Sequence, residues 1–178
     1  MRRLILTVLL SACLGWPLQA ATKTSKDDAN LLAQTRQLAA AMRDSFEDIN
    51  LHSPPLHVDW PAKNGRERGS GAFVFFSLEG RGGSNASMIY AAYFQYDPFD
   101  GDPEDLKRPW KNYRLTDFIQ IVDHAPEWRR AQVTADGVVI PTKTWRENDP
   151  HCCPTGEGAI RIDIDPYGRM TVVNIPRR

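Results

Sequence analysis

The clearest hairpin in the chain is predicted for residues 129–145, which read RRAQVTADGVVIPTKTW. Two strand-like runs, residues 129–134 and 138–145, flank the turn Ala135-Asp136-Gly137. An Asp-Gly pair between such runs favours a tight turn because both residues accept positive φ angles. The stretch therefore predicts antiparallel β structure in the C-terminal half of the chain.

Further strand-like runs lie on both sides of this hairpin. They are residues 56–60, 72–78, 87–96, 113–122, 160–164 and 170–175. Residues 72–78 are apolar at nearly every position, so both faces of this strand are expected to be buried and the strand to be central. In 160–164 isoleucines alternate with charged residues, which indicates one buried face.

A helical period precedes the strands. Ser25 suits a helix N-cap, with Asp28 three residues later, and Pro54-Pro55 ends the pattern. The apolar stripe consists of Leu31, Leu38, Met42, Phe46 and Ile49. The spacing predicts an amphipathic helix over about residues 25–49.

These elements predict one α+β domain over residues 21–178. The N-terminal amphipathic helix is expected to pack on an antiparallel meander of roughly six to eight strands, which occupies about residues 56–176. A chain of 178 residues is long enough for one such core and too short for two.

The first 20 residues have the pattern of a secretory signal peptide. Arg2 and Arg3 precede an apolar run, residues 4–16, and small residues follow at Ala20 and Ala21. The run is shorter than the roughly 20 residues that a membrane-spanning helix needs. We therefore expect an exported protein, periplasmic or secreted, with cleavage after Ala20.

A competing pattern lies inside the same segment. Residues 10–13, Leu-Ser-Ala-Cys, resemble the lipobox of bacterial lipoproteins, in which the cysteine is lipidated. Lipidation of Cys13 would make the protein membrane-anchored. The apolar run continues past Cys13 to Trp16, which favours soluble export.

The charge balance disfavours two classes of partner. Lys+Arg and Asp+Glu number 22 each, and loss of Arg2 and Arg3 with the signal segment (22 − 2) leaves 20 basic against 22 acidic residues. Such a chain lacks the basic footprint for nucleic acid or an anionic membrane surface. The acidic stretch 97–105 does not fit a calcium-binding loop, because Tyr96 and Pro98 fall where carboxylates are needed, and leaves only loose surface binding open.

The densest chemistry stands in Asp149-Pro150-His151-Cys152-Cys153-Pro154-Thr155. Cys152 and Cys153 are the only cysteines after the signal segment, and export places them in an oxidising compartment. We expect a vicinal disulfide that stiffens a turn, strained because adjacent Cα atoms are only about 3.8 Å apart. Buried free thiols and a covalent dimer are the alternatives.

Two further hypotheses use the same segment. His151, Cys152 and Cys153 offer ligands for zinc or copper, with His124 or His57 as a fourth. Consecutive side chains of an extended chain point in opposite directions, so these ligands converge only in a tight turn. Thiol–disulfide exchange is the other hypothesis, although redox cysteines are normally two residues apart at a helix N-terminus.

The C-terminal part resembles the small bacterial envelope proteins of the LppP/LprE-like lipoprotein type. The likeness is carried by Ala135-Asp136-Gly137 and by residues 149–155, and it extends to neither the long helix nor the acidic stretch. The resemblance implies an exported, β-rich bacterial domain. It implies no reaction and no substrate.

No motif in the sequence predicts catalysis. Ser70 and Ser77 lack a glycine elbow, and His57, His124 and His151 fit no catalytic signature. We therefore expect a bacterial envelope domain with a non-enzymatic binding or structural role, without a cofactor, whose partner is a protein or a small molecule. Metal binding or thiol–disulfide chemistry at the His-Cys-Cys segment is the alternative.

We predict that the mature protein begins at Ala21, because the apolar run ends in small residues there. The intact mass of protein purified from its native host measures this directly, and the same spectrum before and after reduction reports the state of the cysteines. An acylated Cys13 at the N-terminus would contradict the prediction.

Overall fold

The computed structural model describes residues 25–42, 46–52, 54–60, 69–80, 87–97, 113–122, 125–135, 137–150 and 153–175. This part of the chain contains one α-helix, ten strands and a short 3-10 helix, η4. The elements are α1 (Ser25–Ala41), β1 (Phe46–Leu51), β2 (Leu56–Asp59), β3 (Ser70–Gly80), β4 (Ser87–Tyr96), β5 (Tyr113–Ile121), β6 (Ala125–Pro126), η4 (Trp128–Arg130), β7 (Gln132–Val133), β8 (Val138–Thr144), β9 (Gly156–Ile164) and β10 (Met170–Ile175).

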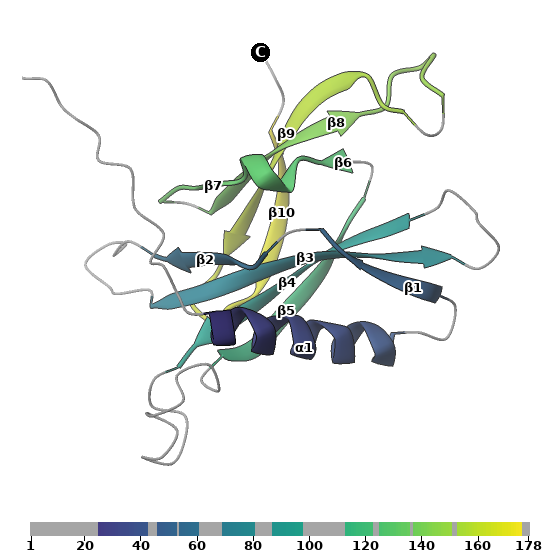
Figure 1. Ribbon diagram of the computed structural model, residues 1–178. Coiled ribbons are helices and arrows are strands. Elements are labelled where there is room, and N and C mark those ends of the chain that lie inside the picture. The colour runs from purple at the N-terminus through teal and green to yellow at the C-terminus, as the bar shows by residue number, and fades with distance from the viewer. Residues whose placement is uncertain are drawn as a thin grey trace, which may run out of the picture.

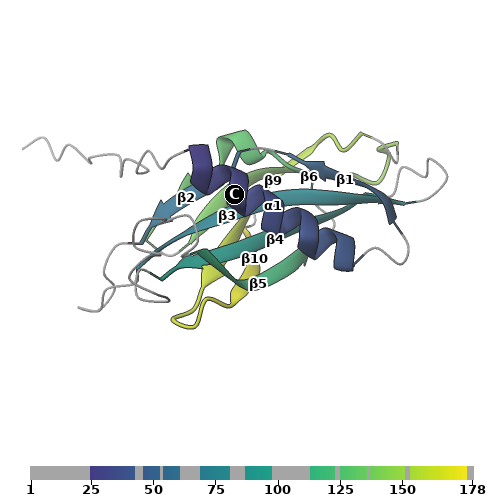
Figure 2. The same cartoon turned by 60° about the horizontal axis from the view of Figure 1, so that its bottom comes forward.

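The strands form two antiparallel sheets of five strands each (Figure 1). In the first sheet β1 and β2 pair with opposite halves of β3, and β4 and β5 follow. In the second sheet β6 and β7 pair with β8, and β9 and β10 follow. Helix α1 runs along the outer face of the first sheet, as Figure 2 shows, and the second sheet lies on its other face.

The prediction of one meander with roughly six to eight strands is therefore wrong. The chain leaves the first sheet at Ile121 and enters the second at Ala125. The physical reason lies in β3, which is apolar on both faces. One helix of 17 residues covers a single face of the first sheet, so a second layer of strands is needed on the other.

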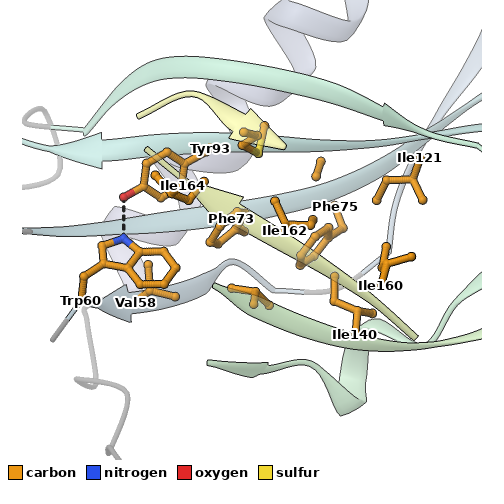
Figure 3. Packing of buried hydrophobic residues seen from close by; sticks show 13 residues of the cluster. Val58, Trp60, Phe73, Phe75, Tyr93, Ile121, Ile140, Ile160, Ile162 and Ile164 are labelled. Atoms are coloured by element: carbon orange, nitrogen blue, oxygen red, sulfur yellow. Dashed lines mark hydrogen bonds between the residues drawn. The ribbon is translucent and has the colours of Figure 1, made fainter. Parts of the chain in front are cut away.

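The main hydrophobic core lies between the two sheets (Figure 3). Its side chains include Phe73, Phe75, Ile140, Ile160 and Ile162, each at most 1% exposed. Full burial of a side chain of this size contributes about 1.5–3 kcal/mol to stability. At one end of this core the Trp60 indole N–H donates to the Tyr93 hydroxyl at 2.8 Å, so the polar group of the indole is satisfied inside the protein.

Helix α1 packs on the opposite face of the first sheet. Its buried residues, Asp27, Leu31, Thr35 and Ala39, recur every four positions. Leu31 and Ala39 belong to the apolar cluster formed with β3 and β4, whereas the Thr35 hydroxyl donates to the Leu31 carbonyl at 2.8 Å. Because two of these four residues are polar, the helix lacks the continuous apolar stripe that the sequence was expected to give it.

The predicted helix is also too long. It ends at Ala41, and Phe46–Leu51 forms β1 instead. Ile49 fits a helical period with Met42 and equally a strand period with Leu51. Backbone pairing with β3 decides in favour of the strand, and Ile49 and Leu51 both pack in the apolar cluster beneath α1.

The predicted hairpin is present, but its first strand is short because residues 128–130 form η4. Gly137 does not adopt a positive φ; among the described glycines only Gly69 and Gly168 do. A Cβ atom at Gly137 would lie 2.3 Å from the Ile162 carbonyl oxygen. The glycine is therefore required by the close approach of β9 rather than by the turn.

A β-bulge in β5 fastens the second sheet to the first. The register shifts between Tyr93 and Phe94, which leaves Thr116 as the extra residue of β5. The Thr116 hydroxyl donates to the Tyr93 carbonyl at 3.2 Å. The next side chain, Asp117, accepts a hydrogen bond from the Met170 N–H at 2.7 Å, where β10 begins.

We predict that Gly168→Ala destabilises the protein more than Gly69→Ala. The two glycines have φ angles of +79° and +73°, at which a Cβ atom costs roughly 1–2 kcal/mol. A Cβ at Gly168 would also lie 2.8 Å from the Thr116 hydroxyl, whereas at Gly69 nothing lies within 4 Å. Urea unfolding of both variants measures the difference, expected to be about 1 kcal/mol or more.

Equal losses in the two variants would mean that the turn between β9 and β10 does not rest on the bulge.

Candidate functional site

The loop between β8 and β9 contains the segment that the sequence singled out. The Asp149 carboxylate accepts hydrogen bonds from the Arg146 N–H (2.8 Å), the Thr155 N–H (2.7 Å) and the Thr155 hydroxyl (2.7 Å). These bonds, with the one from the Thr155 amide as the largest cause, lower the pKa of Asp149. One carboxylate thus ties the two ends of the loop together.

Two backbone turns shape the same loop. The Asp149 N–H donates to the Arg146 carbonyl, and the Cys153 N–H donates to the Pro150 carbonyl, each at 3.0 Å. Such bonds between residues three apart are typical of β-turns. Trp145, at the start of the loop, is 45% exposed. The loop is therefore exposed to solvent and held by its own hydrogen bonds.

Cys153 is exposed and takes part in a disulfide bond. Cys152, His151 and Cys13 lie outside the described residues. The pairing of Cys153 with Cys152 therefore stays a prediction, as does the lipidation alternative at Cys13.

The proposed metal ligands are not all described. His124, like His151 and Cys152, lies outside the described residues, and so does most of the acidic stretch 97–105. His57 lies in the first sheet and contacts Asp28 of α1. Within the described ranges no group of three or more His, Cys, Asp or Glu side chains is arranged to hold a metal ion.

A polar network that sequence reasoning missed lies where α1 begins. His57 Nε2 is 2.7 Å from Asp28 Oδ1, and His57 Nδ1 is 3.3 Å from the Tyr113 hydroxyl. Helix α1, β2 and β5 each contribute one of these side chains. The Gln34 amide adds a bond to the Tyr113 carbonyl at 3.2 Å. Burial, and then the negative charge of Asp27, raises the pKa of Tyr113, so its hydroxyl stays protonated.

This network has the residue types of an acid–base site but joins the helix to the sheet. Tyr113 is 3% exposed and the His57 side chain 10% exposed. These contacts hold α1 against β2 and β5. Asp28, His57 and Tyr113 are far apart in the sequence, so no local spacing indicates the network.

No family model matches the chain, and the searches of curated proteins and of solved structures found no match either. None of the helices in the described ranges has the length and apolar character to cross a membrane. The geometry and exposure of the β8–β9 loop therefore carry the functional inference.

We predict that Asp149→Ala speeds amide hydrogen exchange at Arg146 and Thr155, because both amides lose their acceptor. NMR or peptide-level exchange measures this. Asp165→Ala is the matched control, since Asp165 accepts from the Tyr167 and Arg169 amides in another exposed turn.

Each variant is expected to affect its own turn alone. In the wild type, protection at Arg146 and Thr155 is complete above the ordinary carboxyl pKa of 3.8 and is lost as the pH falls through the lowered value. Unchanged exchange in Asp149→Ala would show that other contacts hold the loop.

Proposed function

We propose that the chain is an exported bacterial envelope domain that binds a protein or small-molecule partner through its β8–β9 loop and catalyses no reaction. The closure of the loop by Asp149 carries this proposal. Fixing the backbone of one residue costs about 1–2 kcal/mol of conformational entropy, and an exposed loop offsets little of this by burial. A loop that is already ordered loses less entropy when a partner binds.

Trp145 supplies the loop with an apolar contact. It is exposed, and its neighbour Arg146 is held through the backbone by Asp149. Aromatic side chains are enriched in protein interfaces because they bury a large area at a small entropic cost. The fixed backbone and the exposed indole together favour recognition at this loop.

The signal-like segment 1–20 supports export. The resemblance to LppP/LprE-like lipoproteins supports an origin in the bacterial envelope. The low exposure of His57 and Tyr113, and the contact of His57 with Asp28 of α1, support a role without catalysis, since this network joins the helix to the sheet. The balanced charge supports a partner other than nucleic acid.

The alternative function uses the cysteine segment itself, as a metal site or in thiol–disulfide exchange. The hydrogen bond from the Cys153 N–H to the Pro150 carbonyl favours it, because this bond holds the two ends of the segment close together. Stoichiometric zinc or copper in purified protein under reducing conditions would support a metal site at His151, Cys152 and Cys153. Insulin reduction that is lost in Cys152→Ser would support exchange.

We predict that a photo-crosslinking benzoylphenylalanine at Trp145 captures a discrete partner in the envelope of the native host, whereas the same residue at Tyr167 does not. Both positions are exposed aromatics, at 45% and 76%, and they lie in different loops. Mass spectrometry of the adducts is the readout. For a small-molecule partner, the readout is an adduct mass on the intact chain.

Identical adducts from both positions would contradict recognition by the β8–β9 loop. Turnover of generic esters, peptides or glycosides by the purified protein would contradict a role without catalysis.

A further inference from the structure

The contact of β5 with the start of β10, near the β-bulge, is one place where the edges of the two sheets meet, and we call such a place a seam. A second seam lies away from this bulge. The outer edge of the first sheet is interrupted between β1 and β2, around Pro54 and Pro55, and that of the second between β6 and β7 by η4. His52 follows β1 and Trp128 begins η4, and their rings stack with centroids 5.9 Å apart. The two interruptions therefore face each other.

Trp128 covers the core at this seam. Its ring stacks on Phe75 with centroids 4.2 Å apart, and Phe75 is 1% exposed. On the other side of the contact, the backbone N–H of His52 donates to the Phe75 carbonyl at 3.1 Å, which fixes the His52 backbone beside Phe75. Displacement of Trp128 would expose Phe75 to water.

The His52 ring is poorly placed to carry a charge. Its Nε2 atom is buried and has no hydrogen-bond partner in the described part of the chain. In neutral imidazole one ring nitrogen lacks a proton, whereas in imidazolium both nitrogens carry one and both need acceptors. Protonation therefore leaves a buried N–H without an acceptor, at a cost to the closed seam.

The charged groups around the ring do not remove this cost. Glu79 of β3 favours the protonated form, but burial outweighs it and lowers the pKa of His52 below the ordinary 6.5. Glu127, which precedes η4, is paired with Arg130 of η4, and Arg129 is exposed. Neutral His52 thus stabilises the closed seam fully above about pH 6.5, and this contribution is lost as the pH falls toward the lowered value.

We propose that the His52–Trp128 contact is an acid-sensitive closure between the two sheets, which opens when the half-buried imidazole, whose Nε2 atom is enclosed, takes up a second proton. Opening releases η4 from the first sheet and exposes Phe75. The device lies apart from the β8–β9 loop and does not depend on its proposed function. Only its use as a response to external pH rests on the proposed export, because an exported protein meets the pH of its surroundings directly.

Histidine NMR of the full mature chain tests this. The expected result is a His52 pKa below 6.5, lowered further in Glu79→Gln, with the Trp128 indole signal and the exchange of the His52 amide changing over the same pH range. A His52 pKa at or above 6.5, or a Trp128 signal that does not follow it, would overturn the proposal.

The variant His52→Phe keeps an aromatic ring against Trp128 and cannot be protonated, so the acid-induced change at Trp128 is expected to disappear. His57→Phe is the matched control, because it removes a histidine of the same edge whose ring contacts α1 instead, and it is expected to retain the change. Loss of the change in both variants, or in neither, would show that His52 is not the group that opens the seam.

Discussion

The structure depends on the burial of β3 on both faces. All residues from 71 to 78 are buried, with Phe73 and Phe75 toward one side and Val74 and Phe76 toward the other. A strand of this kind is stable only between two layers, since either face left in water would forfeit its hydrophobic stabilisation. Helix α1 supplies one layer and the chain after Ala125 supplies the other. The N-terminal helix and the C-terminal hairpins are thus both needed for the same strand.

Apolar burial brings the two sheets together, but it is non-directional and does not fix how they sit. Specific contacts at the two seams fix the position of one sheet on the other. On the β5 side the bulge at Thr116 receives the turn around Gly168, and Asp117 binds the first amide of β10. On the opposite side the stack of His52 on Trp128 closes the interrupted edges. The contact on the β5 side is made by a carboxylate and a backbone amide. The contact on the opposite side is made by an imidazole, the side chain that gains a proton in mild acid, so only this second seam is suited to respond to it.

The sequence predicts most strands because a period of two residues is a local signal. Residues 87–96 and 170–175, for example, are strands as expected. It fails where a pattern fits two structures, as at Ile49, and the pairing partner 29 residues later, Leu78, decides the outcome. The expectation that residues 72–78 form a central strand buried on both faces is confirmed. The sequence does not predict that the second covering layer is a separate sheet, because that depends on how distant strands pair. For the site, the segment 149–155 stands out by composition. The closure of this loop by Asp149 cannot be predicted from the sequence, because an aspartate before a proline is typical of any turn. Only the structure shows that the Arg146 and Thr155 amides both donate to its carboxylate.

Two exposed carboxylates show why the β8–β9 loop differs from an ordinary turn. Asp165 binds the amides of Tyr167 and Arg169, and the turn so formed rests on β5 through Gly168, so its order serves the packing of the sheets. Asp149 makes bonds of the same kind, but its loop carries Pro150, Cys153 and Thr155 in exposed positions. Order in such a loop is not explained by packing, because little apolar surface is buried there to offset the entropy of holding the chain. The bonds of Asp149 hold Arg146 and Thr155 instead, and the proposed recognition would use this order, since the entropic cost is then met in folding and not in binding.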